Sequence, residues 1–174
     1  MKGNTCAAFA LGILMLGCSD DGDGGESTER ASAEIEARSG NSTLSGRASF
    51  TQVRGEAAIT LEIEGAPPGE HGAHIHEFGD CSAADAMSAG EHWNPEDHAH
   101  GEPGNTSHLG DLGNLSVDAD GTGRLTLRSD KWTVGDGGDH DVVGKAIVIH
   151  ANEDDLTSQP SGNSGGRIGC GVIE

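Results

Sequence analysis

The sequence has 174 residues, with 29 acidic and 10 basic side chains, 29 glycines and a formal net charge of −19. This length suits a single folded domain, and abundant glycine with only 3 % aromatic residues favours many turns and small core residues over long packed helices. Nucleic acid and anionic membrane surfaces are excluded as partners, because binding phosphate groups requires clusters of Lys and Arg.

Residues 1–17 are predicted to be a signal peptide. Lys2 precedes an apolar stretch from Cys6 to Gly17 that is too short to span a bilayer. The stretch ends in Leu14-Met15-Leu16-Gly17-Cys18, which resembles a bacterial lipobox, where cleavage precedes a cysteine that is then lipidated. An ordinary signal peptide cut at a nearby small residue is the alternative. We expect an exported protein of the periplasm or cell envelope, held to a membrane only by a lipid on Cys18.

Residues 18–33 are predicted to be a flexible acidic tether, because Asp, Gly, Ser and Glu without an apolar cluster cannot offset the entropy of ordering. The folded part is predicted to span residues 34–174. Of the four cysteines, Cys6 belongs to the signal peptide and Cys18 would carry lipid. The remaining pair, Cys81 and Cys170, would most simply form one disulfide in an exported chain.

The folded part shows the period-two pattern of strands. Residues 57–64 alternate apolar and polar side chains, which places Ile59, Leu61 and Ile63 on one face. Residues 115–119 and 124–127 then flank Asp-Gly-Thr-Gly, a sequence typical of a hairpin turn.

Later in the chain, residues 142–150 form a nearly continuous apolar run, as in a strand that is buried on both faces. These short strands with glycine-rich turns predict an all-β fold, an antiparallel Greek-key β-sandwich or barrel. Two long stretches, residues 77–113 and 152–169, interrupt the pattern. Loops of that length in a compact domain usually carry function.

Histidine is the most informative residue type, since the chain has nine. In His74-Ile75-His76 the strand period points both imidazoles to one face and Ile75 to the other. Neutral imidazole binds copper and zinc well. His71 and His140 are more simply interpreted as structural or exposed side chains.

A second group of ligand types lies in the first long stretch. His92 is followed by His100 after eight residues, by His108 after eight more, and by Asp111 three residues later. Three imidazoles and one carboxylate complete a tetrahedral zinc site with no open position, which is typical of structural zinc. His98 is a rival of His100 for this role.

Several segments now resemble, in order, the Cu,Zn superoxide dismutase family, from about Ser42 to the C-terminus. They are Gly69-Glu70-His71-Gly72-Ala73-His74-Ile75-His76-Glu77-Phe78-Gly79-Asp80, Ser88-Ala89-Gly90-Glu91-His92-Trp93-Asn94-Pro95, His108-Leu109-Gly110-Asp111-Leu112-Gly113-Asn114, Gly138-Asp139-His140 with Val148-Ile149-His150, and Gly162-Asn163-Ser164-Gly165-Gly166-Arg167-Ile168-Gly169-Cys170-Gly171-Val172-Ile173.

The resemblance implies a metal site with two ions that share one imidazole. The implied copper ligands are His74, His76, His92 and His150. The implied zinc ligands are His92, His100, His108 and Asp111. The family's aspartate that links a copper-ligating to a zinc-ligating histidine falls on Asp154, with Asp155 as its nearest rival. The family disulfide falls on Cys81 and Cys170, and the active-site arginine on Arg167.

The resemblance also implies the activity, which is dismutation of superoxide to O2 and hydrogen peroxide by a Cu(II)/Cu(I) ping-pong cycle with a His-bridged structural zinc. His92 would carry a proton to the product, and Arg167 would hold the superoxide anion by charge-assisted hydrogen bonds. The alternative is a copper storage or delivery module on the same fold, without turnover. Bacterial members occur as monomers and as dimers, so a homodimer is a possible assembly.

Overall fold

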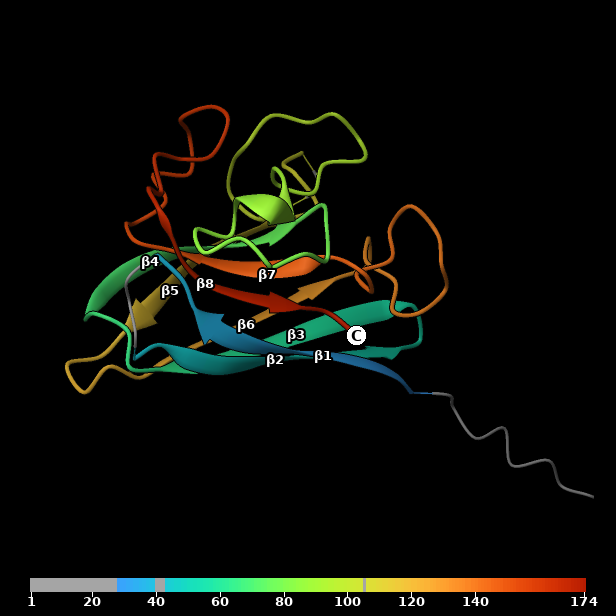
Figure 1. The fold of residues 1–174 in the computed structure, drawn as a ribbon. Coiled ribbons are helices and arrows are strands. Elements are labelled where there is room, and N and C mark those ends of the chain that lie inside the picture. Colours follow the sequence, from blue (N-terminus) through green and yellow to red (C-terminus); the bar gives the residue numbers. More distant parts are fainter. Residues whose placement is uncertain (1–27, 40–42, 105) are drawn as a thin grey trace, which may run out of the picture.

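The computed structural model describes residues 28–39, 43–104 and 106–174 (Figure 1). The predicted signal peptide, the predicted lipidation site Cys18 and most of the predicted tether lie outside the described residues.

Eight strands form one closed antiparallel barrel. They are β1 (Glu29–Ala37), β2 (Ser45–Val53), β3 (Glu56–Glu64), β4 (Gly69–His76), β5 (Asp111–Val117), β6 (Gly123–Ser129), β7 (Ala146–His150) and β8 (Arg167–Val172). Their order around the barrel is β1-β2-β3-β6-β5-β4-β7-β8, so the β3–β4 and β6–β7 connections each skip two strands, as in a Greek key. The prediction of an antiparallel all-β fold is confirmed.

The alternating pattern works as predicted in β3. Ile59, Leu61 and Ile63 are buried in the barrel core, and the glutamates between and after them face solvent. The predicted hairpin is also present, since β5 and β6 pair at Val117 and Gly123 across a turn in which Gly121 has a φ of 85°. This left-handed conformation favours glycine.

The folded part begins earlier than predicted, because β1 starts at Glu29 and not near Glu34. Ala31 and Ala33 are buried opposite Phe50 and Ala48 of β2. The tether was predicted because residues 18–33 contain no apolar cluster, and two alanines do not form one by themselves. Pairing along the whole of β2 supplies the missing contacts, so the described end of the predicted tether is part of the barrel.

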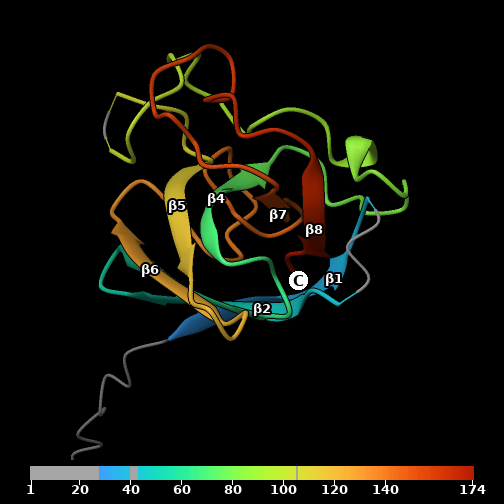
Figure 2. The same cartoon turned by 90° about the vertical axis from the view of Figure 1, so that its left-hand side faces the viewer.

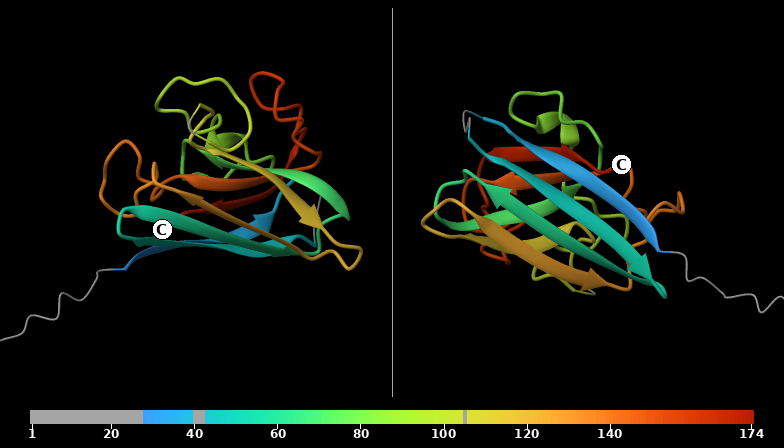
Figure 3. Two further views of the ribbon diagram at one scale, coloured as in Figure 1. Left: turned by 180° about the vertical axis from the view of Figure 1, so that it is seen from behind. Right: turned by 90° about the horizontal axis from the view of Figure 1, so that it is seen from below.

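Two long loops lie on the same side of the barrel, over β4, β7 and β8 (Figures 1 and 2). We name residues 77–110 the first loop and residues 151–166 the second loop. Strands β1, β2, β3 and β6 form the opposite wall, as the view from below shows (Figure 3). The only helical segment in the described ranges is the single 3-10 turn η1 (Met87–Ala89) in the first loop.

This cover explains the continuous apolar run in β7. Ile147 and Ile149 face the barrel core, whereas Ala146 and Val148 pack outward with Ala86 and other small residues of the first loop. Both faces of β7 are therefore dry. Within the described residues, no helix has the length and apolar character to cross a membrane.

Candidate metal centre

Strand β4 places His74 and His76 on its outer face, underneath the two loops. Both side chains are fully buried there, while Ile75 between them joins the barrel core. β4 pairs with β7, and His150 ends that strand opposite Arg167 of β8.

The first loop brings His92 to the same place by running back along β4. The Trp93 N–H donates to the Ile75 carbonyl oxygen at 2.9 Å, and His76 and His92 form a β-bridge. Gly110 N–H in turn donates to the Trp93 carbonyl oxygen. A Cβ atom on Gly110 would overlap the Ile75 carbonyl oxygen, so this close approach requires glycine.

Four imidazoles converge at one point and are named the copper quartet: His74, His76, His92 and His150. One ring nitrogen from each lies within 4.8 Å of the others. Those nitrogens, His74 Nδ1 and the Nε2 atoms of His76, His92 and His150, are buried and have no hydrogen-bond partner among the described residues.

Hydrogen bonds to the other ring nitrogens explain how the imidazoles of the copper quartet are oriented. His76 Nδ1 lies 2.9 Å from the Gly90 carbonyl oxygen, and His150 Nδ1 lies 3.2 Å from the Gly165 carbonyl oxygen. Each must donate its proton to a carbonyl, which leaves a lone pair on Nε2. His74 Nε2 donates likewise to Asp154 at 2.8 Å, which leaves the lone pair on Nδ1.

Burial keeps these rings neutral. It lowers the pKa of His74 to about 4 and of His150 to about 3, and it lowers the pKa of His76 well below its ordinary value. Converging neutral imidazole lone pairs without partners are what a copper ion requires, so the copper quartet fits that metal.

Three imidazoles surround one carboxylate oxygen of Asp111. We name these four residues the zinc set: His92, His100, His108 and Asp111. The Nδ1 atoms of His92 and His100 each lie 3.0 Å from Asp111 Oδ1, and that of His108 lies 3.3 Å away. The group whose ligand atoms all lie within 4.8 Å of one another here contains His74, His92, His100 and Asp111, and so does not include His108. All four members of the zinc set are buried.

The zinc set suits a divalent cation. Burial alone would raise the pKa of Asp111, but hydrogen bonds from His108 and His92 lower it well below its usual range. A buried carboxylate held ionised among three imidazoles matches the ligand number and types of a closed tetrahedral zinc site. His92 belongs to both groups, with Nδ1 facing Asp111 and Nε2 facing the copper quartet.

Asp154 connects the two groups. Its Oδ2 lies 2.8 Å from His74 Nε2, and its Oδ1 lies 2.9 Å from His100 Nε2. Its rival Asp155 is exposed and accepts hydrogen bonds within its own loop. A Cβ atom on Gly162 would overlap Asp154 Oδ1, so glycine is needed above this carboxylate.

The other histidines lie outside both groups. Of the two rivals for the zinc set, only His100 faces Asp111, because His98 directs Nδ1 to the Ser107 carbonyl oxygen at 3.1 Å. His71 contacts two backbone carbonyl oxygens. His140 is half-buried, and its Nε2 lies 3.5 Å from Glu96 Oε1.

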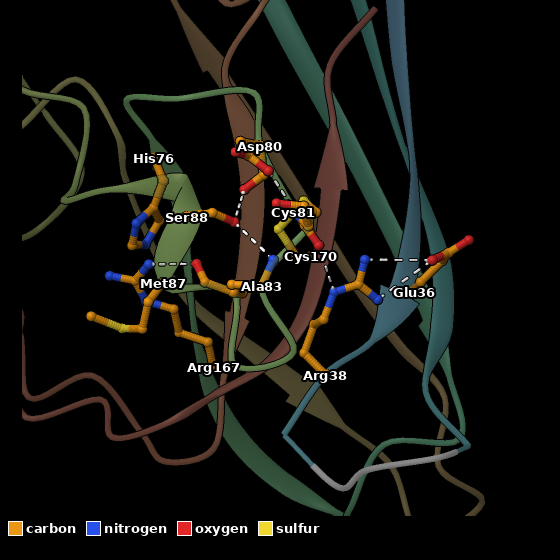
Figure 4. The surroundings of a disulfide bond; sticks show 12 residues. Glu36, Arg38, His76, Asp80, Cys81, Ala83, Met87, Ser88, Arg167 and Cys170 are labelled. Atoms are coloured by element: carbon orange, nitrogen blue, oxygen red, sulfur yellow. Dashed lines mark hydrogen bonds and ion pairs between the residues drawn. A yellow bond between two sulfur atoms is a disulfide. The ribbon is translucent and has the colours of Figure 1, made fainter.

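Arg167 lies at the copper side of the centre, in a cavity of about 240 Å³ that is also lined by His76, His92 and His150. The guanidinium donates to the Ala86 carbonyl oxygen at 2.8 Å and to the Gly90 carbonyl oxygen at 2.7 Å. Both acceptors belong to the first loop. Figure 4 shows His76 and Met87 beside this guanidinium.

Cys81 of the first loop and Cys170 of β8 form a disulfide (Figure 4). The bond ties the segment that carries the Ala86 and Gly90 carbonyls to the strand that carries Arg167. Arg38, directly after β1, donates to the Cys81 carbonyl oxygen at 3.2 Å.

The cavity is acidic at its rim, where Asp85 and Glu91 are exposed. Arg167 is the only arginine or lysine that lines it in the described part of the chain. The Nζ atom of Lys145 lies 5.7 Å from the centroid of the Trp93 ring, and Lys145 does not line this cavity.

The sequence did not reveal the two side chains that fix the main chain of Asp154 and of His100. The Asn114 side-chain amide pairs with both main-chain polar groups of Asp154, each at 2.8 Å. The Gln159 side-chain amide does the same for His100. Asn114 lies within a segment that carries the family resemblance, which was an available signal, whereas nothing in the sequence around Gln159 marked it.

Comparisons with known proteins agree with this geometry. The sequence model of the family described as copper/zinc superoxide dismutase (SODC) matches residues 44–173. The chain is 38 % identical, over 156 residues, to an extracellular superoxide dismutase [Cu-Zn] of Brugia pahangi, and the match covers 84 % of this chain and 77 % of that protein.

Two solved structures are also similar. The clock protein EA4 superposes with a TM-score of 0.73 at 39 % identity, over 83 % of this chain and 93 % of that one. A double mutant of a SOD-like protein from Bacillus subtilis superposes with a TM-score of 0.71 at 34 % identity, over 80 % of this chain and 94 % of that one.

Proposed function

The chain belongs to the copper/zinc superoxide dismutase family, and from this premise we propose that the copper quartet and the zinc set together convert two superoxide anions and two protons to O2 and hydrogen peroxide. One observation supports the proposal most strongly. Four imidazole nitrogens without hydrogen-bond partners among the residues that the structure describes converge beside a cavity that is lined by Arg167.

The two metals have separate tasks in this proposal. Copper, when bound by the copper quartet, supplies the one-electron chemistry by alternating between Cu(II) and Cu(I), while zinc in the zinc set is structural. Asp154 orients His74 and His100 together, because it accepts a hydrogen bond from each ring.

Arg167 binds the superoxide anion. Two of its five N–H groups donate to loop carbonyls, which fixes the plane of the guanidinium and leaves three donors for the substrate. Burial lowers the pKa of Arg167 but leaves an arginine charged at any physiological pH. Since Asp85 and Glu91 oppose anion entry at the rim, Arg167 is the side chain that supplies local attraction, beside the charge of the bound metals.

His92 moves the proton. Its Nδ1 is held on the side of Asp111, so Nε2 is the atom that takes up a proton and delivers it to the reduced substrate in the cavity. Burial lowers the pKa of His92, which favours release of that proton after its uptake.

The proposal is tested by loading the purified protein with copper and zinc and measuring superoxide consumption. His150→Ala should abolish turnover and lower the bound copper, whereas the matched change His140→Ala, at a half-buried histidine outside both groups, should leave both intact. Stoichiometric binding of both metals without superoxide consumption would favour a copper storage or delivery module instead.

We also propose that the protein is exported, with residues 1–17 as its signal peptide and a lipid on Cys18 that holds it in the periplasm or cell envelope. The Cys81–Cys170 disulfide supports export, because such bonds persist in oxidising compartments. The similar Brugia protein is named extracellular. Labelling with a radioactive fatty acid in the presence and absence of Cys18→Ser tests the lipid, and cell fractionation tests the location.

A homodimer is proposed on one surface feature. Phe78 and Val143 are exposed apolar side chains, and their neighbours Gly79 and Gly144 pack against each other. A second copy would cover this apolar surface. Light scattering of the purified protein, compared with Phe78→Glu, tests the assembly.

A further inference from the structure

We infer that Gln159 is a positioning residue for the zinc half of the centre, a role that rests on the proposed function because it acts through the proposed zinc ligand His100. Gln159 lies in the second loop and His100 in the first, 59 positions apart in the chain.

The side-chain amide of Gln159 pairs with the main chain of His100 as a strand neighbour would. The His100 N–H donates to Gln159 Oε1 at 2.8 Å, and Gln159 Nε2 donates to the His100 carbonyl oxygen at 2.9 Å. Two hydrogen bonds to a single residue fix both its position and its rotation. His100 needs such a partner, because it lies in a loop and has no strand neighbour to satisfy its backbone.

The amide itself has only one satisfied orientation. Its second N–H donates to the Thr157 carbonyl oxygen at 3.1 Å, so the nitrogen faces two carbonyls and the oxygen faces an N–H donor. Every polar atom of the side chain is used. The contact is therefore specific for an amide of this length.

His100 is then held from two directions by the second loop. Asp154 orients the imidazole through Nε2, while Gln159 fixes the backbone from which the imidazole projects. Nδ1 is thereby directed at Asp111 Oδ1. Two anchors in one loop determine where the ring can lie, whereas Asp154 alone would leave the backbone of His100 free to shift.

Similar amide pairs occur elsewhere around the centre. Asn114 pairs with the main chain of Asp154, and Asn94 pairs with the main chain of His98. Only the Gln159 pair joins the main chain of a zinc-set member directly. Loosening it should therefore affect zinc and leave the copper quartet in place.

The test uses Gln159→Glu, which keeps the size of the side chain and the acceptor for the His100 N–H. It replaces the donor with an oxygen that faces two carbonyl oxygens. A matched control is Asn163→Asp, which makes the same charge change in the same loop. It removes an amide that donates to Asp155 and Ser158 and does not touch His100.

Both variants of the fully metallated protein are treated with a chelator, and release of zinc and of copper is followed separately. Gln159→Glu should release zinc about fivefold faster than the parent protein, with copper release unchanged. Cobalt(II) placed in the zinc set should show a shifted visible absorption spectrum in Gln159→Glu and an unshifted one in Asn163→Asp.

Three outcomes overturn the inference. Zinc release equal to that of the parent protein would show that Gln159 does not position His100. Equal acceleration in Asn163→Asp would assign the effect to loop mobility or charge, and faster release of both metals would assign it to general loss of structure. Failure of the parent protein to bind zinc would be different, since it would refute the proposed function itself.

Discussion

Replacing both disulfide cysteines by alanine should destabilise the protein strongly, because the unfolded chain gains conformational entropy when the bond is lost. The bond joins positions 89 apart, and the chain-entropy relation for a loop of this size gives about 4.6 kcal/mol at 25 °C. For a domain of this size that corresponds to a fall in Tm of about 10–18 °C. Alanine is preferred to serine because Cys170 is buried, and a hydroxyl there would add its own cost.

The assay is urea denaturation of the metallated protein, followed by circular dichroism. The Cys81→Ala, Cys170→Ala double variant and the chemically reduced parent protein should agree within experimental error, since both lose the same constraint. A loss of stability below about 1 kcal/mol would refute the chain-entropy reasoning. It would mean that the reduced, unfolded chain already keeps the first loop close to β8.

The double variant should also show a higher KM for superoxide, because the disulfide ties the first loop to the strand of Arg167. The Ala86 and Gly90 carbonyls that hold the guanidinium both lie in that loop. An unchanged KM would show that the hydrogen bonds alone position Arg167.

Three further changes should give distinct results. Arg167→Ala should lower kcat/KM by about 10- to 100-fold, from the loss of charge-assisted hydrogen bonds, with metal content unchanged. Arg128→Ala makes the same charge change at the surface and should have no such effect. If Arg167→Ala turned over superoxide as fast as the parent protein, Arg167 would have no part in the mechanism. Gly162→Ala should lower zinc affinity by about tenfold, because the new methyl group displaces the Asp154 carboxylate. Competition with a chelator measures this affinity, and a value equal to that of the parent protein would contradict the prediction. The metal-free protein should lose stability as pH falls from about 7 towards 4. The imidazoles of the copper quartet have lowered pKa values in the folded state, so they take up protons first in the unfolded state. The raised pKa of His100 acts in the opposite direction, but it is one group against four. A denaturation midpoint that does not vary with pH would contradict this prediction.

Much of the fold was predictable, because alternation in sequence maps directly onto a barrel wall. Residues 57–64 show this in β3, and His74-Ile75-His76 shows it at the centre, where two imidazoles face out and one isoleucine faces in. The start of β1 was not predictable in the same way. Alanine carries little hydrophobic signal, and its burial depends on a partner strand that local composition does not reveal.

The candidate site was also predictable only in part. Side chains with ligand chemistry are visible in a sequence, and the structure brings together the residues of the copper quartet and the zinc set. What holds them is less visible. Arg167 is held by backbone carbonyls, which every residue possesses, and Gln159 holds His100 through the main chain of that histidine. Such contacts follow from loop conformation, which residue types alone do not specify.

The point where the chain joins the barrel has a practical consequence for attaching this enzyme to a solid support. β1 pairs with β8 near Cys170 through Glu36, and Glu29 lies seven residues earlier, about 23 Å away along an extended strand. Figure 1 shows β1 starting at the opposite end of the barrel from the start of β8. Immobilisation or fusion through the amino-terminal side would therefore place the support at the end of the barrel away from Arg167, the first residue of β8.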